Sequence, residues 1–255
     1  MVIAIIALLM SILMPTLQRV RRQAKAVACR ASFRQWGPVL DMYASDDPQM
    51  LRERWWPEIL VPETSNIAGI TRRIAFCPAT TTRHKGPLGH AEKATAWIAT
   101  DAFSTWDLGS GSSYGALGSY GLNGWLGNEF PPYKDVEHKD WYWCAFESHG
   151  SNQIPVLMDC RMVEGGPDER DPPPEYEDKI SASNYARYQM VRFCINRHDG
   201  GVNGLFMDWS VRKVGLKELW TLKWNRQFDT RGKWTKAGGV KPEDWPEWMR
   251  GFKDY

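Results

Sequence analysis

The first seventeen residues constrain this chain more than any other stretch. Residues 1–17, with the sequence MVIAIIALLMSILMPTL, contain no charged side chain. Basic residues follow in residues 19–25. Apolar or small residues then recur at helical spacing and give one face to pack on a sheet, namely Val20, Ala24, Val27, Ala28, Ala31, Val39, Met42 and Tyr43. This pattern predicts one long helix that ends at about Ala44, with an apolar first half and an amphipathic second half.

Two prolines, Pro15 and Pro38, lie inside the predicted helix. Proline donates no backbone hydrogen bond, and its ring crowds the preceding turn of a helix. We therefore expect the helix to be kinked or broken at both positions. The sequence Asp46-Asp47-Pro48 is expected to end it.

Several separate stretches together resemble one family. The residues VIAIIALLMSILMPTLQRVRRQAKAVACRASFRQWG are similar to the N-terminal region of the prepilin-type proteins of planctomycetes and related bacteria, a group like type IV pilins and type II secretion pseudopilins. The likeness continues in Phe76-Cys77-Pro78, in residues 119–123 and in residues 197–224. In that family a basic leader and a glutamate-bearing segment come before the apolar run, so we expect them upstream of Met1.

The resemblance implies a fold and a function. The fold is α+β: a pilin-like helix over residues 1–45, packed on an antiparallel β-sheet in a head domain over residues 46–255 that has long loops. The function is that of a structural subunit, not an enzyme, which assembles with its own copies into a pilus or pseudopilus through the apolar helix. Before assembly a single span holds it in the inner membrane with the body in the periplasm, and no nucleic acid is expected as a partner.

Two other interpretations of the apolar run fit less well. A cleaved secretory signal has its basic residues before the apolar centre and a small-residue cleavage site after it, whereas here the basic residues follow and no A-x-A occurs. A simple membrane anchor needs about twenty apolar residues, slightly more than this run provides. A pilin helix accounts for both the shortness and Pro15.

The charge of the chain is unevenly distributed. Residues 1–34 hold six basic and no acidic residues, which leaves 26 basic against 30 acidic residues, or −4, for the rest. A basic helix and an acidic body can attract each other between subunits. A solvated helix face, or basic residues at a membrane boundary, explains the same pattern.

Five cysteines are spread along the chain without a C-x-x-C pair, so neither a zinc knuckle nor a thioredoxin-type motif is present. The family resemblance places cysteines at Cys29 and Cys77, and an oxidising compartment would favour a disulfide between them. We therefore predict that bond. The pairing of Cys144, Cys160 and Cys194 stays open.

The family also carries a histidine, nine further residues and Asp-Gly at a hairpin. This chain has His198 and Asp208 in that pattern, with Trp209 in place of the glycine. A catalytic His-Asp pair is conceivable. A buried hydrogen bond that braces the hairpin is the favoured interpretation, because buried polar side chains generally have such partners.

Other candidate sites have weaker support. Ser113 lies in a G-x-S-x-G sequence without the preceding strand that a nucleophile elbow needs. The histidine pairs His84 with His90 and His138 with His149 lack metal-ligand spacing. Acidic residues at 168–178 could bind calcium, as the resemblance to calcium-binding pseudopilins suggests, but a solvated acidic loop is the simpler interpretation. We expect no other cofactor.

The fourteen tryptophans of the chain suggest one alternative function. If several coplanar rings were exposed, the chain would be a membrane-tethered module that binds carbohydrate or another surface ligand. Buried rings would instead belong to the core.

The remaining elements are predicted from local patterns. Strands are expected at residues 74–76, 120–126, 141–146, 154–160 and 189–196, and a hairpin at 204–208 and 211–214. Residues 80–118 read as long loops, residues 216–228 as a closing helix and residues 241–245 as the start of a short one.

Overall fold

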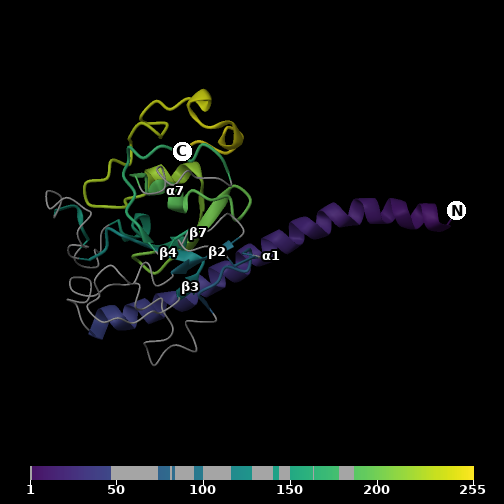
Figure 1. The fold of residues 1–255 in the computed structure, drawn as a ribbon, viewed down its shortest axis with the longest axis horizontal. Coiled ribbons are helices and arrows are strands. Elements are labelled where there is room, and N and C mark those ends of the chain that lie inside the picture. The colour runs from purple at the N-terminus through teal and green to yellow at the C-terminus, as the bar shows by residue number, and fades with distance from the viewer. Residues whose placement is uncertain are drawn as a thin grey trace.

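The computed structural model describes residues 2–46, 74–80, 82–83, 95–99, 116–127, 140–143, 150–162, 164–177 and 187–255. Its longest element is helix α1, Val2–Asp46. The N-terminal half of α1 projects from the body, and the C-terminal half lies along it (Figure 1). The prediction of one long helix is confirmed, and its end falls two residues beyond the predicted one.

Helix α1 continues through Pro15 and Pro38, so neither proline breaks it. Figure 1 shows one continuous helix that curves gently. Near Pro15, the hydroxyl of Thr16 donates to the carbonyl oxygens of Leu13 at 2.8 Å and Ile12 at 3.3 Å. Such bonds from a threonine hydroxyl to the carbonyls three and four residues earlier occur within helices.

One stripe of α1 is buried against the body. Cys29, Phe33, Trp36 and Leu40 are fully buried, and their spacing of four, three and four residues places them on one helical face. This face packs against strands β7 (Gly201–Phe206) and β8 (Val211–Gly215). The helix is thus confirmed, but the face predicted to pack on a sheet is not the buried one, because Val20, Val27 and Met42 of that face are exposed.

The larger sheet has five strands in the order β6-β4-β5-β7-β8. Strand β4 spans Tyr120–Asn123, β5 Pro155–Asp159 and β6 Glu164–Gly165. Strands β4, β5, β7 and β8 pair antiparallel, whereas β4 and β6 pair parallel. The body is thus α+β with a mixed sheet, and the prediction of a purely antiparallel sheet is wrong because the short β6 joins the edge in the parallel sense.

A second sheet lies in the region predicted to be loops. It has the order β1 (Thr82–Arg83), β2 (Thr95–Ala99) and β3 (Ala116–Gly118), with β1 parallel and β3 antiparallel to β2. Glycine, serine and threonine dominate the surrounding sequence and obscure the strand-forming core of β2, which contains Thr, Trp and Ile.

The predicted hairpin is confirmed as β7 and β8, although β7 begins three residues earlier than expected. Its turn contains Trp209 in the left-handed conformation, with φ of 62°. That conformation usually favours glycine. Here the indole N–H of Trp209 donates to Asp41 of α1 at 3.0 Å, so this residue also joins the turn to the helix.

Several short elements differ from prediction. Within residues 189–196 the chain forms helix α7, Met190–Phe193, instead of a strand. The closing helix is reduced to the 3₁₀ turn η3, Lys217–Thr221. Residue 74 is helical and residues 75–76 form a bend, where a strand was predicted. Of residues 141–146, the described part is a turn in which Trp143 forms an isolated bridge with Leu126. A short apolar run fits a strand, a helical turn or a packed loop equally well, so periodicity cannot decide among them.

Three further 3₁₀ turns complete the described elements: η2 (Ser151–Gln153), η4 (Pro242–Asp244) and η5 (Glu247–Met249). The C-terminal segment packs on the body through Trp245, whose ring lies 5.4 Å from those of Trp220 and Trp234. This aromatic group extends the core beyond the sheet.

Candidate functional site

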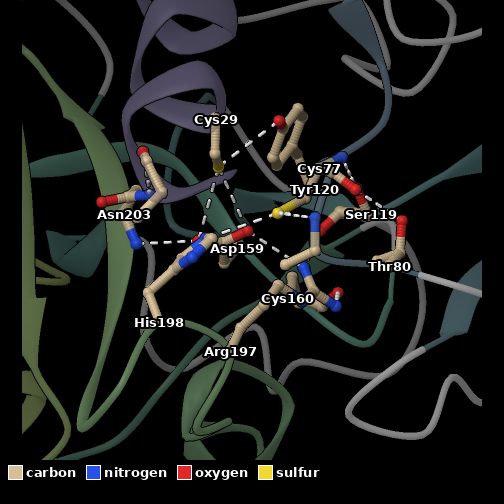
Figure 2. Close-up of polar contacts among 12 residues, drawn as sticks. Cys29, Cys77, Thr80, Ser119, Tyr120, Asp159, Cys160, Arg197, His198 and Asn203 are labelled. Carbon is tan, nitrogen blue, oxygen red and sulfur yellow. Dashed lines mark hydrogen bonds and ion pairs between the residues drawn. The ribbon is translucent and has the colours of Figure 1, made fainter. Parts of the chain in front are cut away.

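Four side chains from distant parts of the sequence meet where α1 reaches the larger sheet. They are Cys29, Cys77, Asp159 and His198, and one donor atom of each lies within 4.8 Å of the donor atoms of the others. All four residues are buried. Figure 2 shows their side chains pointing toward one another. We call these four residues the Cys-Asp-His cluster.

Each member of the cluster is placed by a different element. Cys29 lies on the buried stripe of α1. Asp159 is the last residue of β5, after four buried residues of that strand. His198 precedes β7, and its backbone N–H donates to the carbonyl of Gly201 at 3.0 Å.

Cys77 is held by contacts from both the helix and the sheet. The indole N–H of Trp36 on α1 donates to the carbonyl of Ile74 at 3.0 Å. On the sheet side, the hydroxyl of Ser119 accepts a hydrogen bond from the backbone N–H of Cys77. The backbone at Cys77 is therefore fixed although residues 75–80 form no helix or strand.

Asp159 is the centre of the polar contacts. Its Oδ1 accepts from Nη1 of Arg197 at 3.0 Å. Its Oδ2 accepts from the backbone N–H of Asn203 at 2.7 Å and lies 3.1 Å from Nε2 of His198. Arg197 also donates to the carbonyls of Ser119 at 2.5 Å and of Cys160 at 3.2 Å. A buried carboxylate is thus satisfied by charged and backbone donors, as burial requires.

The two thiols are hydrogen-bonded within the same group. Cys29 Sγ lies 3.7 Å from Asp159 Oδ1 and accepts from the hydroxyl of Tyr120 at 3.5 Å. Cys77 Sγ lies 3.3 Å from Nε2 of His198 and accepts from the backbone N–H of Ala79 at 3.4 Å. Both sulfur atoms therefore have donors that would stabilise a thiolate.

The charges in the cluster shift its pKa values strongly. Burial alone raises the pKa of Asp159, but the charges of His198 and Arg197 outweigh it and lower that pKa to about 2. Burial lowers the pKa of His198, and the neighbouring Asp159 more than reverses this and raises it to about 9. Burial raises the pKa of both thiols; at Cys77, hydrogen bonds from Cys29 and His198 prevail and lower the pKa to about 6, while that of Cys29 stays raised.

The geometry does not suit a nucleophilic triad. In a Cys-His-Asp triad the thiol and the carboxylate contact opposite nitrogens of the imidazole. Here Cys77 and Asp159 both approach Nε2 of His198, and all three residues are buried away from substrate. The cluster is instead a compact set of two sulfur, one nitrogen and one oxygen donor, which are the atoms that hold a metal ion.

The predicted Cys29–Cys77 disulfide is not formed in this structure, where both residues are free, buried thiols. The structure does bring the two sulfur atoms within 4.8 Å of each other, next to Asp159 and His198. The pairing therefore stays a prediction. Cys160 and Cys194 are also free and buried but lie outside the cluster, and Cys144 lies outside the described residues.

His198 and Asp208 do not contact each other, because they lie at opposite ends of the hairpin. His198 pairs with Asp159. Asp208 is exposed in the turn, where its Oδ1 accepts from the backbone N–H of Ser210 at 2.9 Å. The sequence pattern therefore marks two separate hairpin contacts instead of one pair.

The acidic residues considered for calcium are engaged by protein donors where the structure describes them. Oδ2 of Asp171 accepts from the backbone N–H groups of Asp168, Gln189 and Met190 at 2.8–3.2 Å, and Asp168 pairs with Arg170. Among the described residues, the Cys-Asp-His cluster alone gathers three or more potential ligands. Ser113 and the four histidines at positions 84, 90, 138 and 149 lie outside the described residues.

The tryptophans whose side chains are described face inward. Seven are buried, namely Trp36, Trp125, Trp143, Trp220, Trp224, Trp234 and Trp245. Three others, at positions 141, 209 and 248, are half-buried. Within this part of the chain there is thus no exposed aromatic platform of the kind a surface-binding module needs.

The second unusual feature is the apolar surface of the projecting half of α1. Nine large apolar side chains between positions 3 and 17 are exposed: Ile3, Ile5, Ile6, Leu9, Met10, Ile12, Leu13, Met14 and Leu17. At 3.6 residues per turn they cover an arc of about 200° around the helix. A helix apolar over so wide an arc is normally buried by other helices or by lipid.

Sequence reasoning overlooked Asp159, Arg197, Tyr120 and Asn203. Asp159 could have been noticed in the sequence as a carboxylate at the end of an apolar strand. Arg197 stands next to His198 inside the stretch that carries the family resemblance. Nothing local indicated that these residues meet Cys29 and Cys77.

Comparisons of the chain with protein-family models, with curated proteins and with solved structures find no match. Among the described helices, none combines the length and the apolarity required to cross a membrane.

Proposed function

We propose that this protein is the structural subunit of a filament of the type IV pilus or type II secretion pseudopilus kind. Subunits assemble by packing the apolar halves of α1 together, and the same segment holds a subunit at the inner membrane before assembly. The observation that carries the proposal is the exposed apolar arc of α1. In a lone subunit this surface would face water, at a cost that association removes.

The arc is better suited to a bundle of helices than to one partner surface. A helix that docks on a single partner needs a stripe about 100° wide, and the exposed apolar arc is about twice as wide. Even if packing gains only part of the usual 1.5–3 kcal/mol for each large side chain, nine such residues contribute on the order of 10 kcal/mol per subunit. A gain of this size is comparable with the cost of lost translational and rotational freedom on association, about 4–15 kcal/mol.

The charges after the apolar run favour a staggered arrangement. Arg19, Arg21 and Arg22 follow the apolar half on an exposed stretch of α1, and the rest of the chain beyond residue 34 carries a net charge of −4. In a filament, the basic stretch of one helix would lie beside the acidic body of a neighbour. The attraction helps to orient subunits, a task that non-directional apolar packing cannot perform alone.

The test is electron microscopy of material sheared from the surface of cells that make the full chain, with antibody labelling. Leu13→Glu places a charge in the apolar arc, at a cost of at least about 2.5 kcal/mol in an apolar surrounding. Met42→Glu is the matched control, because Met42 is 62% exposed and Leu13 60% exposed on the same helix. We expect labelled filaments from the parent and Met42→Glu and none from Leu13→Glu; a parent without filaments, or Leu13→Glu with them, refutes the proposal.

A further inference from the structure

We propose that the Cys-Asp-His cluster binds one zinc ion, held by Sγ of Cys29, Sγ of Cys77, a carboxylate oxygen of Asp159 and Nε2 of His198. The ion would join α1 to the body of the protein. This inference is independent of filament assembly, because it rests on a different part of the chain.

The spacing of the donor atoms fits tetrahedral zinc. With bonds of about 2.3 Å to sulfur and about 2.0–2.1 Å to nitrogen or oxygen, a tetrahedral zinc ion separates its ligand atoms by about 3.3–3.8 Å. Nε2 of His198 lies 3.1 Å from Oδ2 of Asp159 and 3.3 Å from Sγ of Cys77. Sγ of Cys29 lies 3.7 Å and 3.8 Å from the two oxygens of Asp159. Only small movements of the four side chains are needed to bring their donor atoms to bonding distance of one zinc ion.

The kinds of donor select zinc over other common ions. Calcium and magnesium take oxygen ligands, whereas thiolate, imidazole and carboxylate are all ligands of zinc. All four positions are filled by protein side chains that are buried. A closed site of this kind has no free position for water or substrate, so its role is structural.

The charges around the site balance when zinc is bound. Two thiolates and one carboxylate carry three negative charges, zinc supplies two positive ones, and the adjacent Arg197 supplies the third. Arg197 lies 3.0 Å from Asp159, and its side chain is almost fully buried. The buried group as a whole is then neutral, which avoids the cost of an uncompensated charge in the interior.

A second set of contacts orients the ligands. The hydroxyl of Tyr120 donates to Cys29, and the backbone N–H of Ala79 donates to Cys77. The backbone N–H of Asn203 donates to Asp159. Three of the four ligands thus have outer hydrogen bonds, which is the usual arrangement around bound metals.

The first experiment measures metal in the full-length chain, purified in detergent with reductant and without chelator. We expect about one zinc per chain by mass spectrometry, as a four-ligand site holds one ion. Cobalt(II) exchanged into the parent should give the thiolate-to-metal band and the intense visible bands of tetrahedral coordination. This spectrum needs no variant, so a folding defect cannot obscure it.

Variants then assign the ligands. Cys77→Ala and His198→Ala should each lower zinc affinity roughly tenfold or more, while Cys194→Ala should retain zinc, because Cys194 is an equally buried free cysteine outside the cluster. Alkylation followed by peptide mapping should find Cys29 and Cys77 protected until a chelator is added.

Three results would overturn the proposal. One is a parent without stoichiometric zinc whose thiols are freely alkylated. Another is a Cys29–Cys77 disulfide in a zinc-free parent purified separately without reductant, which would support the predicted bond instead. The third is zinc that persists in both folded ligand variants, as judged by circular dichroism.

Discussion

Asp159→Asn is the substitution that most directly tests how the cluster stabilises the fold. The change keeps the shape of the side chain but removes the negative charge that pairs with Arg197 and His198. The guanidinium of Arg197 then stays buried without its counter-ion. The new amide also places N–H groups where Asp159 had only acceptors, so it can satisfy Asn203 but not every donor around it.

The cost can be worked out from these contacts. Removing one partner of a buried ion pair costs about 3–5 kcal/mol, because the other charge remains desolvated. For a chain of this length each kcal/mol lowers the midpoint of thermal unfolding by roughly 2–4 °C. We therefore expect Asp159→Asn to lower the midpoint by about 6–20 °C.

The assay is thermal unfolding of the full chain in detergent, followed by circular dichroism and by tryptophan fluorescence. Reductant and chelator are present throughout, so that neither a disulfide nor a metal contributes. Asp208→Asn is the control, because Asp208 is exposed and an amide oxygen can still accept from Ser210; its midpoint should change by no more than the small amount usual for surface sites. An Asp159→Asn midpoint within about 2 °C of the parent would show that the buried pair does not stabilise the fold as argued.

Three further outcomes follow from the structure. Deleting residues 1–18 should give a soluble monomer by size-exclusion chromatography with light scattering, because the buried stripe of α1 begins later; an aggregated product contradicts this. Gly121→Ala should destabilise by about 1–3 kcal/mol in urea unfolding, because the added Cβ would lie 2.4 Å from the carbonyl oxygen of Met162, and an unchanged midpoint would count against the packing. The stability difference between the metal-free parent and Asp159→Asn should be largest between about pH 4 and 6.5, a comparison that leaves out the other shifted groups, Cys77 and Asp171. The contribution of Asp159 is lost as pH falls from its ordinary pKa of 3.8 towards 2, and that of His198 is lost as pH rises from 6.5 through about 9; a difference that stays constant from pH 3 to 9 refutes the assignment.

The long helix and the central strands were predictable because each depends on a local pattern. The uncharged run and the helical spacing of the apolar residues up to Tyr43 indicate a helix over many turns. They did not indicate which face is buried, because the body covers Cys29, Phe33, Trp36 and Leu40 instead of the predicted face. The strand β5 and the hairpin of β7 and β8 likewise contain enough apolar residues to be recognised. Long periodic segments carry redundant information, so one unfavourable residue such as Pro38 does not change the outcome.

The shorter elements were not predictable in the same way. Residues 190–193 form a helical turn because Asp171, nineteen residues earlier, accepts from the N–H groups at its start. Strand β6 has two residues, and its parallel pairing with β4 depends on a contact between distant segments. In both cases tertiary contacts decide a conformation that local propensity leaves open.

The cluster was the least predictable feature, since its members are separated by 48, 82 and 39 positions along the sequence. Spacing rules find metal sites only when ligands lie close together in sequence. The family resemblance drew attention to Cys29 together with Cys77, and to His198 apart from them. Only the packing of α1 on β7 brings them to Asp159, and no local motif encodes that packing.

The position of Cys29 connects the two proposals. Among the α1 positions whose burial is described, Cys29 is the first that is fully buried when the helix is followed from the N-terminus. In a filament held by the apolar half of α1, a pulling force on the body reaches each subunit's interior first at this point. A zinc–thiolate bond at Cys29 would oppose the first step in the separation of α1 from the sheet. The apolar contacts of Phe33, Trp36 and Leu40 would be strained only after that bond breaks. Because the contacts of α1 would break one after another, the bond at Cys29 would determine the force at which separation starts. The total energy of the contacts further along α1 would not change that force.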